Sequence, residues 1–207
     1  MGELYLIRHA QASFGAENYD KLSKLGREQS IALGKALSKQ GIKPDVWMIG
    51  DMRRHRETVE GIVEGMSISN PAPIIHRGLN EFDFTELLNA RYRGQPAPDN
   101  MHSDRKTHFR ILRQTVLAWQ QGEIENPPET WDAFVNRIEA ARRFIIKQIG
   151  QNVLALSSGG AIGQMVAATL QTPTEQQIKL QLQIKNCSVS RFIFTSSAFY
   201  LHGFNET

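Results

Sequence analysis

Short apolar runs recur along the chain, and each is bounded by polar or charged residues. Runs of about four to eight apolar residues are typical of strands buried inside a sheet. The run at residues 4–7 ends at Arg8 and His9, and the run at 153–156 ends at a Ser-Ser-Gly-Gly sequence. We predict strands at residues 4–7, 46–49, 74–75, 153–156, 189–194 and 199–202.

Between these runs, apolar residues recur at the three- and four-residue spacing of amphipathic helices. Ser23 is a suitable N-cap for the first helix, and Gly41 is a suitable residue to end it. The apolar stripe expected on this helix consists of Leu25, Ala32, Leu33, Ala36 and Leu37.

Asp51 is placed to cap a second helix. The stripe of that helix consists of Met52, Val59, Ile62, Val63 and Met66. Further helices are predicted at residues 103–121, 131–149 and 161–170, with a short one starting at Thr174. The stretch 82–100 is rich in Gly, Pro and polar residues, which predicts irregular structure.

Strands that alternate with helices indicate an α/β fold. We predict a three-layer, doubly wound and largely parallel sheet with helices on both faces. Residues 1–207 form a single domain, and the segment from about 82 to 128, which interrupts the alternation, is expected to be a partly helical cap insertion. Ligands of such sheets bind beyond the carboxyl ends of the strands, which directs attention to the residues that follow each strand.

The composition of the 207-residue chain is that of an ordinary folded protein, with 41% hydrophobic and 22% charged residues. Its single cysteine, Cys187, cannot form an internal disulfide, and no apolar run approaches the ~20 residues that cross a membrane. The net charge of +3 comes without a long Lys/Arg tract. We therefore expect a cytoplasmic protein with neither membrane nor nucleic acid as partner, and a homodimer remains open.

His9 and Arg8 follow the first predicted strand. A neutral imidazole can act as a covalent nucleophile, and a neighbouring guanidinium can bind a phosphoryl group with two hydrogen bonds. Two residues alone favour the simpler interpretation of an ordinary polar strand end. Arg54 strengthens the functional interpretation, because it lies in the first turn of a predicted helix, where free N–H groups already favour an anion.

The turn Ser158-Gly159-Gly160 lies between a predicted strand and a predicted helix. Glycines there let backbone amides approach a phosphate, although a tightly capped helix would need the same residues. Three carboxylates, Glu81, Asp83 and Glu86, follow the third predicted strand. Any of them could protonate the leaving oxygen of a phosphate ester, and any could equally be a solvated surface group.

Five segments in this order resemble the histidine phosphatase superfamily, which comprises phosphoglycerate-mutase-like proteins. The strand that ends at Arg8-His9-Ala10 is similar to the family's strand ending in Arg-His-Gly. The other four similar segments are residues 19–29, 51–58, 79–81 and 153–160. Arg54 and Thr58 stand at the family's second arginine and its threonine, and Ser158-Gly159-Gly160 stands where the family has His-Gly-Gly.

The resemblance implies a two-step phosphoryl transfer without a metal or other cofactor. His9 would form a phosphohistidine, while Arg8 and Arg54 hold the phosphoryl oxygens. Glu81 would protonate the leaving oxygen and later activate water. Ser158 and Gly159 complete the expected phosphate-binding set, and the expected partner is a small phosphorylated substrate.

Three positions depart from the family pattern. Ala10 replaces a glycine, and Gly15 stands where many members have a phosphate-contacting asparagine, so Ser13 is expected to contribute a hydroxyl or amide instead. The largest departure is Ser158, because a serine donates a hydrogen bond but carries no charge. Loss of one preorganised donor costs about 10²–10³ in rate, and the serine retains a donor.

The sequence favours a phosphatase that hydrolyses a phosphate monoester. A non-catalytic module that binds a phosphorylated ligand or a protein is the alternative suggested by Ser158. A phosphoglycerate mutase is less favoured, since the chain is short and the long basic and aromatic loop of such mutases is not found after Glu81. A protein phosphohistidine phosphatase is also less favoured, because its open site does not suit the size of the 82–128 segment.

Overall fold

The computed structural model describes residues 1–13, 20–94, 96, 105–148 and 150–207. The strands are β1 (Gly2–Arg8), β2 (Val46–Ile49), β3 (Ile74–Ile75), β4 (Asn152–Ser157), β5 (Val189–Phe194) and β6 (Phe199–Glu206). The helices are α1 (Lys24–Lys39), α2 (Arg53–Met66), the 3₁₀ helix η1 (Arg77–Leu79), α3 (Phe84–Arg91), α4 (Arg105–Gln120), α5 (Trp131–Ile146), α6 (Gly159–Thr169) and α7 (Gln176–Gln181).

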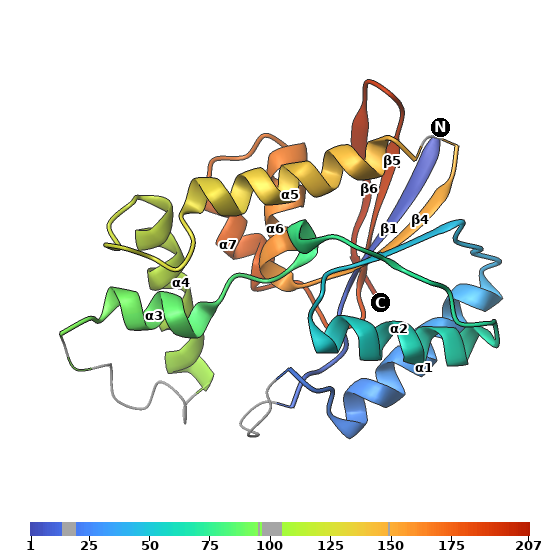
Figure 1. The fold of residues 1–207 in the computed structure, drawn as a ribbon, viewed down its shortest axis with the longest axis horizontal. Coiled ribbons are helices and arrows are strands. Elements are labelled where there is room, and N and C mark those ends of the chain that lie inside the picture. Colours follow the sequence, from blue (N-terminus) through green and yellow to red (C-terminus); the bar gives the residue numbers. More distant parts are fainter. Residues whose placement is uncertain (14–19, 95, 97–104, 149) are drawn as a thin grey trace.

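The six strands form one sheet in the order β3-β2-β4-β1-β5-β6 (Figure 1). Strands β1, β2, β3 and β4 are mutually parallel, and only β5 runs against its two neighbours. The predicted strands and the largely parallel sheet are confirmed. Because β1 and β4 are adjacent and parallel, Arg8 pairs with Ser157, and the residues after both strands meet at one edge of the sheet.

Alternate residues of each strand face two separate cores, as the period of a strand requires. On one face, Leu4 and Leu6 of β1 pack with residues of α5 and α6, including Phe134 and Ile162. On the other face, β1 contributes Tyr5 and Ile7, which pack with residues of α1 and α2. Helices therefore cover both faces of the sheet, which confirms the predicted three layers (Figure 1).

Helices α1 and α2 pack through small residues, and the predicted apolar stripe on α1 is wrong in part. Gly26, Ser30 and Gly34 are buried, whereas Leu25 is 49% exposed. A Cβ built on Gly34 would lie 2.1 Å from the Ile62 carbonyl oxygen, and one on Gly65 would meet the backbone of α1. Close approach of two backbones selects small residues here, which a search for large apolar side chains does not detect.

Two local predictions are also wrong. The stretch 82–100 is not wholly irregular, because it contains α3, whose N-cap Asp83 accepts a hydrogen bond from the Glu86 N–H at 3.0 Å. The pair Asp-x-x-Glu is a capping signal. Asp51 does not cap α2, because its carboxylate instead accepts hydrogen bonds from Asn80 and Arg77.

The described residues of the segment 82–128 add several large apolar side chains to the main core. Leu87 of α3 and Val116 and Trp119 of α4 belong to the same buried cluster as Phe134 of α5. Within the described ranges, no helix is long and apolar enough to cross a membrane. The predicted end of the 131–149 helix at Ile149 lies outside the described residues, and α5 ends at Ile146.

Candidate active site

His9 follows the central strand β1, and its backbone is held on both sides. Its N–H donates to the Ser157 carbonyl at 3.0 Å, and its carbonyl accepts from the Asn186 side chain at 3.0 Å. Its ring Nδ1 lies 2.7 Å from the Ala10 carbonyl oxygen. Since a carbonyl oxygen can only accept, Nδ1 carries the proton and Nε2 retains the lone pair of a nucleophile.

The environment of His9 favours the neutral imidazole. The residue is 5% exposed. Burial lowers the pKa of His9 well below its usual value, and the nearby charges of Arg54 and Arg8 lower it further. The cationic surroundings that would bind an anion therefore also keep the His9 ring neutral.

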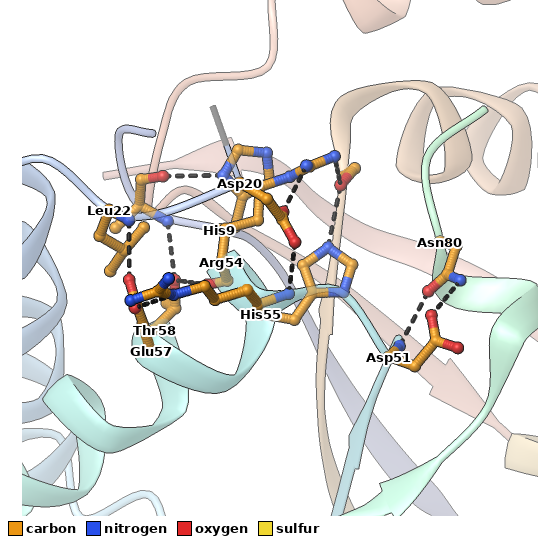
Figure 2. Close-up of polar contacts among 12 residues, drawn as sticks. His9, Asp20, Leu22, Asp51, Arg54, His55, Glu57, Thr58 and Asn80 are labelled. Carbon is orange, nitrogen blue, oxygen red and sulfur yellow. Dashed lines mark hydrogen bonds and ion pairs between the residues drawn. The ribbon is translucent and has the colours of Figure 1, made fainter. Parts of the chain in front are cut away.

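Arg54 is buried in the first turn of α2, next to the His9 strand end (Figure 2). Its backbone carbonyl accepts from Thr58 Oγ1 at 2.6 Å, and Thr58 Oγ1 in turn accepts from the Ala10 N–H at 3.1 Å. The Arg54 Nη1 lies 2.7 Å from Oδ1 of Asp20. The Asp20 Oδ2 accepts from the Arg53 N–H at 2.7 Å. A carboxylate therefore already occupies an anion position at this helix start.

Arg8 and Gly159 lie together on the neighbouring strand ends. A guanidinium N–H of Arg8 donates to the Ile184 carbonyl. A Cβ built on Gly159 would lie 3.7 Å from the Arg8 Cζ, so the start of α6 runs directly beside this guanidinium. The two predicted arginines and the predicted glycine turn are thus brought to one edge of the sheet.

Ser158 occupies the N-cap position of α6, but its side chain does not cap the helix. The alternative that this serine is only a helix cap is therefore wrong. Its Oγ lies 2.9 Å from Nε2 of His55 and accepts from Nη2 of Arg54 at 3.4 Å. The hydroxyl is fully buried and lies between the Arg54 guanidinium and the His55 imidazole.

Of the three predicted carboxylates, Glu81 reaches the sheet edge that carries Arg8 and His9. Its Oε2 accepts from the Gly160 N–H at 2.9 Å, at the start of α6. Desolvation raises the pKa of Glu81, against the opposing effects of the Gly160 N–H and of Arg54 and Arg8. A carboxyl that holds its proton more firmly than usual is suited to be a general acid. A Cβ on Gly160 would lie 2.1 Å from Oε1 of Glu81, so a larger residue here would displace the Glu81 carboxyl group.

The other candidates have different positions. Asp83 caps α3 and Glu86 accepts from the Asn89 side chain, so both have structural partners. The Ser13 N–H donates to the Lys21 carbonyl at 2.8 Å, and a role of Ser13 toward phosphate stays a prediction. Gly15 lies outside the described residues.

His55 is the residue that the sequence interpretation missed. It is fully buried, and its ring centroid lies 5.9 Å from that of His9 (Figure 2). Burial lowers the pKa of His55 to about 3, and the charge of Arg54 contributes. A signal was present, because His55 precedes Val59, Ile62 and Met66 by four, seven and eleven positions and so shares their buried face.

In the part of the chain that the structure describes, no three His, Cys, Asp or Glu side chains are grouped so that they could hold a metal ion. The sheet edge brings together an imidazole, two guanidinium groups, a hydroxyl and a carboxyl group.

Comparison with known proteins points to one family. The family described as "Histidine phosphatase superfamily (branch 1)" matches residues 4–207. A 2,3-bisphosphoglycerate-dependent phosphoglycerate mutase of Bartonella henselae is 32% identical over 195 residues, covering 86% of each chain. A mutase of the same name from Rhizobium meliloti is 32% identical over 193 residues, covering 87% of this chain and 85% of that protein.

Solved structures of both phosphatases and mutases share the fold. A phosphoserine phosphatase from Entamoeba histolytica, in complex with 3-phosphoglyceric acid, superposes with a TM-score of 0.70 at 17% identity, covering 100% of this chain and 98% of that one. A phosphoglycerate mutase from Bacillus anthracis gives 0.69 at 19% identity, covering 99% and 92%. At these identities the structures establish the architecture, and the activity must be argued from the site.

Proposed function

This chain belongs to the histidine phosphatase superfamily, and on that premise we propose that it hydrolyses a small phosphate monoester through a phosphohistidine on His9. The proposal is carried by one observation. The Nδ1 of His9 is committed to the Ala10 carbonyl, which leaves Nε2 as a buried, neutral nucleophile beside Arg54.

The first step would transfer the phosphoryl group to the enzyme. His9 Nε2 attacks phosphorus, the ester P–O bond breaks, and its electron pair goes to the leaving oxygen, which takes the proton of Glu81. Arg8 and Arg54 stabilise the charge on the equatorial phosphoryl oxygens. For Arg54 this requires that the phosphate share the guanidinium with Asp20.

The second step would release inorganic phosphate. The Glu81 carboxylate takes a proton from a water molecule, whose oxygen attacks phosphorus as the P–N bond breaks and its electron pair returns to Nε2 of His9. The described residues thus suffice for both steps, and independence from metal ions is part of the proposal.

The direct test is a hydrolysis screen with an aryl phosphate and a panel of phosphorylated metabolites. We expect wild-type activity on at least one ester and its loss in His9→Ala. His202→Ala is the matched control, because His202 lies exposed on β6, remote from the sheet edge that carries His9. Equal inactivity of wild type and His9→Ala across the panel would contradict the proposal.

Phosphoglycerate mutase is a second candidate, and the two full-length relatives named above favour it. A mutase returns the phosphoryl group from histidine to a second hydroxyl of the substrate, whereas a phosphatase passes it to water. Conversion of 3- to 2-phosphoglycerate, primed by the bisphosphate and faster than release of phosphate, would select the mutase.

A binding module without catalysis is the remaining alternative. It would bind a phosphorylated ligand through Arg8 and Arg54 but form no covalent intermediate. Phosphate-dependent binding without a phosphoenzyme would support it, and phosphate bound covalently to His9 would exclude it.

A further inference from the structure

The side chain of His55 contacts the Ser158 hydroxyl. Nε2 of His55 and Oγ of Ser158 are 2.9 Å apart, and both residues are fully buried. Arg54 Nη2 donates to the same Oγ at 3.4 Å. The hydroxyl therefore links a buried imidazole to the anion-binding arginine.

The backbone leaves space for this imidazole. A Cβ built on Gly50 would lie 2.5 Å from Nδ1 of His55, so any larger residue at position 50 would displace the ring. Gly50 follows β2, and its backbone favours the charged ring of His55. Nδ1 of His55 is buried without a hydrogen-bond partner among the described residues. One ring nitrogen thus lies beside Gly50 and the other faces Ser158.

We propose that His55 is a positioning residue that acts through Ser158: when a phosphate dianion enters the pocket, His55 takes up a proton and directs the Ser158 hydroxyl to a phosphoryl oxygen. The inference rests on the proposed function for its importance, but it concerns binding of the anion and not its hydrolysis. It assigns to His55 a positive charge that Ser158 itself cannot supply.

The step is a protonation followed by reorientation of a hydroxyl. With the pocket unliganded, Arg54 donates to Ser158 Oγ, and the Ser158 proton points to the lone pair on Nε2 of His55. A proton from solvent then binds Nε2, which becomes a donor to Oγ. The Ser158 O–H turns to the anion, the Nδ1–H faces Gly50, and no bond of the ligand breaks.

Several charged or titratable groups face His55. They are Arg54 on the same helix, Asp51 in the turn after β2, and His9 at the end of β1. Arg54 disfavours a second positive charge, whereas the Asp51 carboxylate favours it. A dianion held by Arg54 would offset the repulsion by that arginine, so the occupied pocket and the unliganded pocket should differ in the protonation of His55.

The test measures protons taken up when inorganic sulfate binds, by calorimetry in buffers of different ionisation enthalpy at pH 6. Sulfate stays a dianion there, so any uptake belongs to the protein. We expect uptake in the wild type and in His9→Asn, which removes the other pocket imidazole. We expect little uptake in His55→Gln, together with about tenfold weaker sulfate binding, because a glutamine retains a donor but carries no charge.

Uptake that persists in His55→Gln, or that disappears in His9→Asn, would overturn the inference, as would failure of sulfate to bind the wild type. A second measurement does not depend on whether the His55→Gln variant folds. In nuclear magnetic resonance spectra of His9→Asn, sulfate should shift one buried histidine ring from the neutral to the protonated position. If the wild type takes up a proton when sulfate binds but hydrolyses no ester, only the proposed function is contradicted. If it hydrolyses an ester but takes up no proton when sulfate binds, only this inference is contradicted.

Discussion

Nδ1 of His9 lies 2.7 Å from the carbonyl oxygen of Ala10, and this contact leaves Nε2 as the nitrogen that would attack in the proposed reaction. The neighbouring residue of the chain supplies the acceptor, so the tautomer is set at the strand end itself. Burial and the two arginines keep the ring neutral. The same residues would bind an anion and preserve the nucleophile.

The pH dependence of hydrolysis should reflect opposite pKa shifts of His9 and Glu81. His9 must be neutral, and its lowered pKa preserves that form into the acid range. Glu81 must be protonated to donate, and its raised pKa extends that form upward. For alkyl phosphates we expect kcat/KM to be maximal on the acid side of neutrality and to fall as pH rises.

Glu81→Gln is the control for that profile, because substrate ionisation affects both proteins equally. The ratio of wild-type to variant kcat/KM should fall as pH rises through the raised pKa of Glu81. A ratio that is constant with pH would show that this carboxyl is not the proton donor.

Glu81→Gln should also separate substrates by their leaving groups. With an alkyl phosphate the leaving oxygen needs a proton, and the expected loss in kcat/KM, which reports the first step alone, is about 10²–10⁴. With a nitrophenyl phosphate the leaving group is already stable as an anion, so the loss should be much smaller. Equal losses on both esters would contradict the role of Glu81 as a general acid.

Gly34→Ala tests the close packing of α1 on α2. Its Cβ would lie 2.1 Å from the Ile62 carbonyl oxygen, and a backbone atom cannot move without shifting the helix. We expect the free energy of unfolding to fall by about 1–3 kcal/mol, measured by urea denaturation. Lys35→Ala, on the exposed face of the same helix, should change it little.

The strands and most helices could be predicted because their patterns are local. Each of the apolar runs that form β1, β2 and β4 is bounded by polar residues, so a few residues predict both the strand and its ends. The pocket was predicted in part, since Arg8 and His9 and the turn 158–160 follow adjacent parallel strands. Glu81 could be named only among three carboxylates, and the structure separates them by giving Asp83 and Glu86 local partners.

The remaining features depend on contacts between distant segments. The buried face of α1 consists of small residues because α2 lies against it, and no large side chain marks that face. His55 is meaningful only beside Ser158, which is 103 positions away in the chain. Periodicity and spacing describe residues that are close in sequence, so they cannot show that Ser158 and His55 are in contact.

The covalent intermediate is the most direct test of the central claim. The protein would be incubated briefly with an ester that it hydrolyses. The reaction would be quenched in alkali, and the digested protein would be analysed by mass spectrometry. We predict one phosphoryl group on the peptide that contains His9, stable in alkali, lost in acid and absent from His9→Asn. Turnover of the ester with no phosphate on His9, or with phosphate that survives acid, would contradict the account.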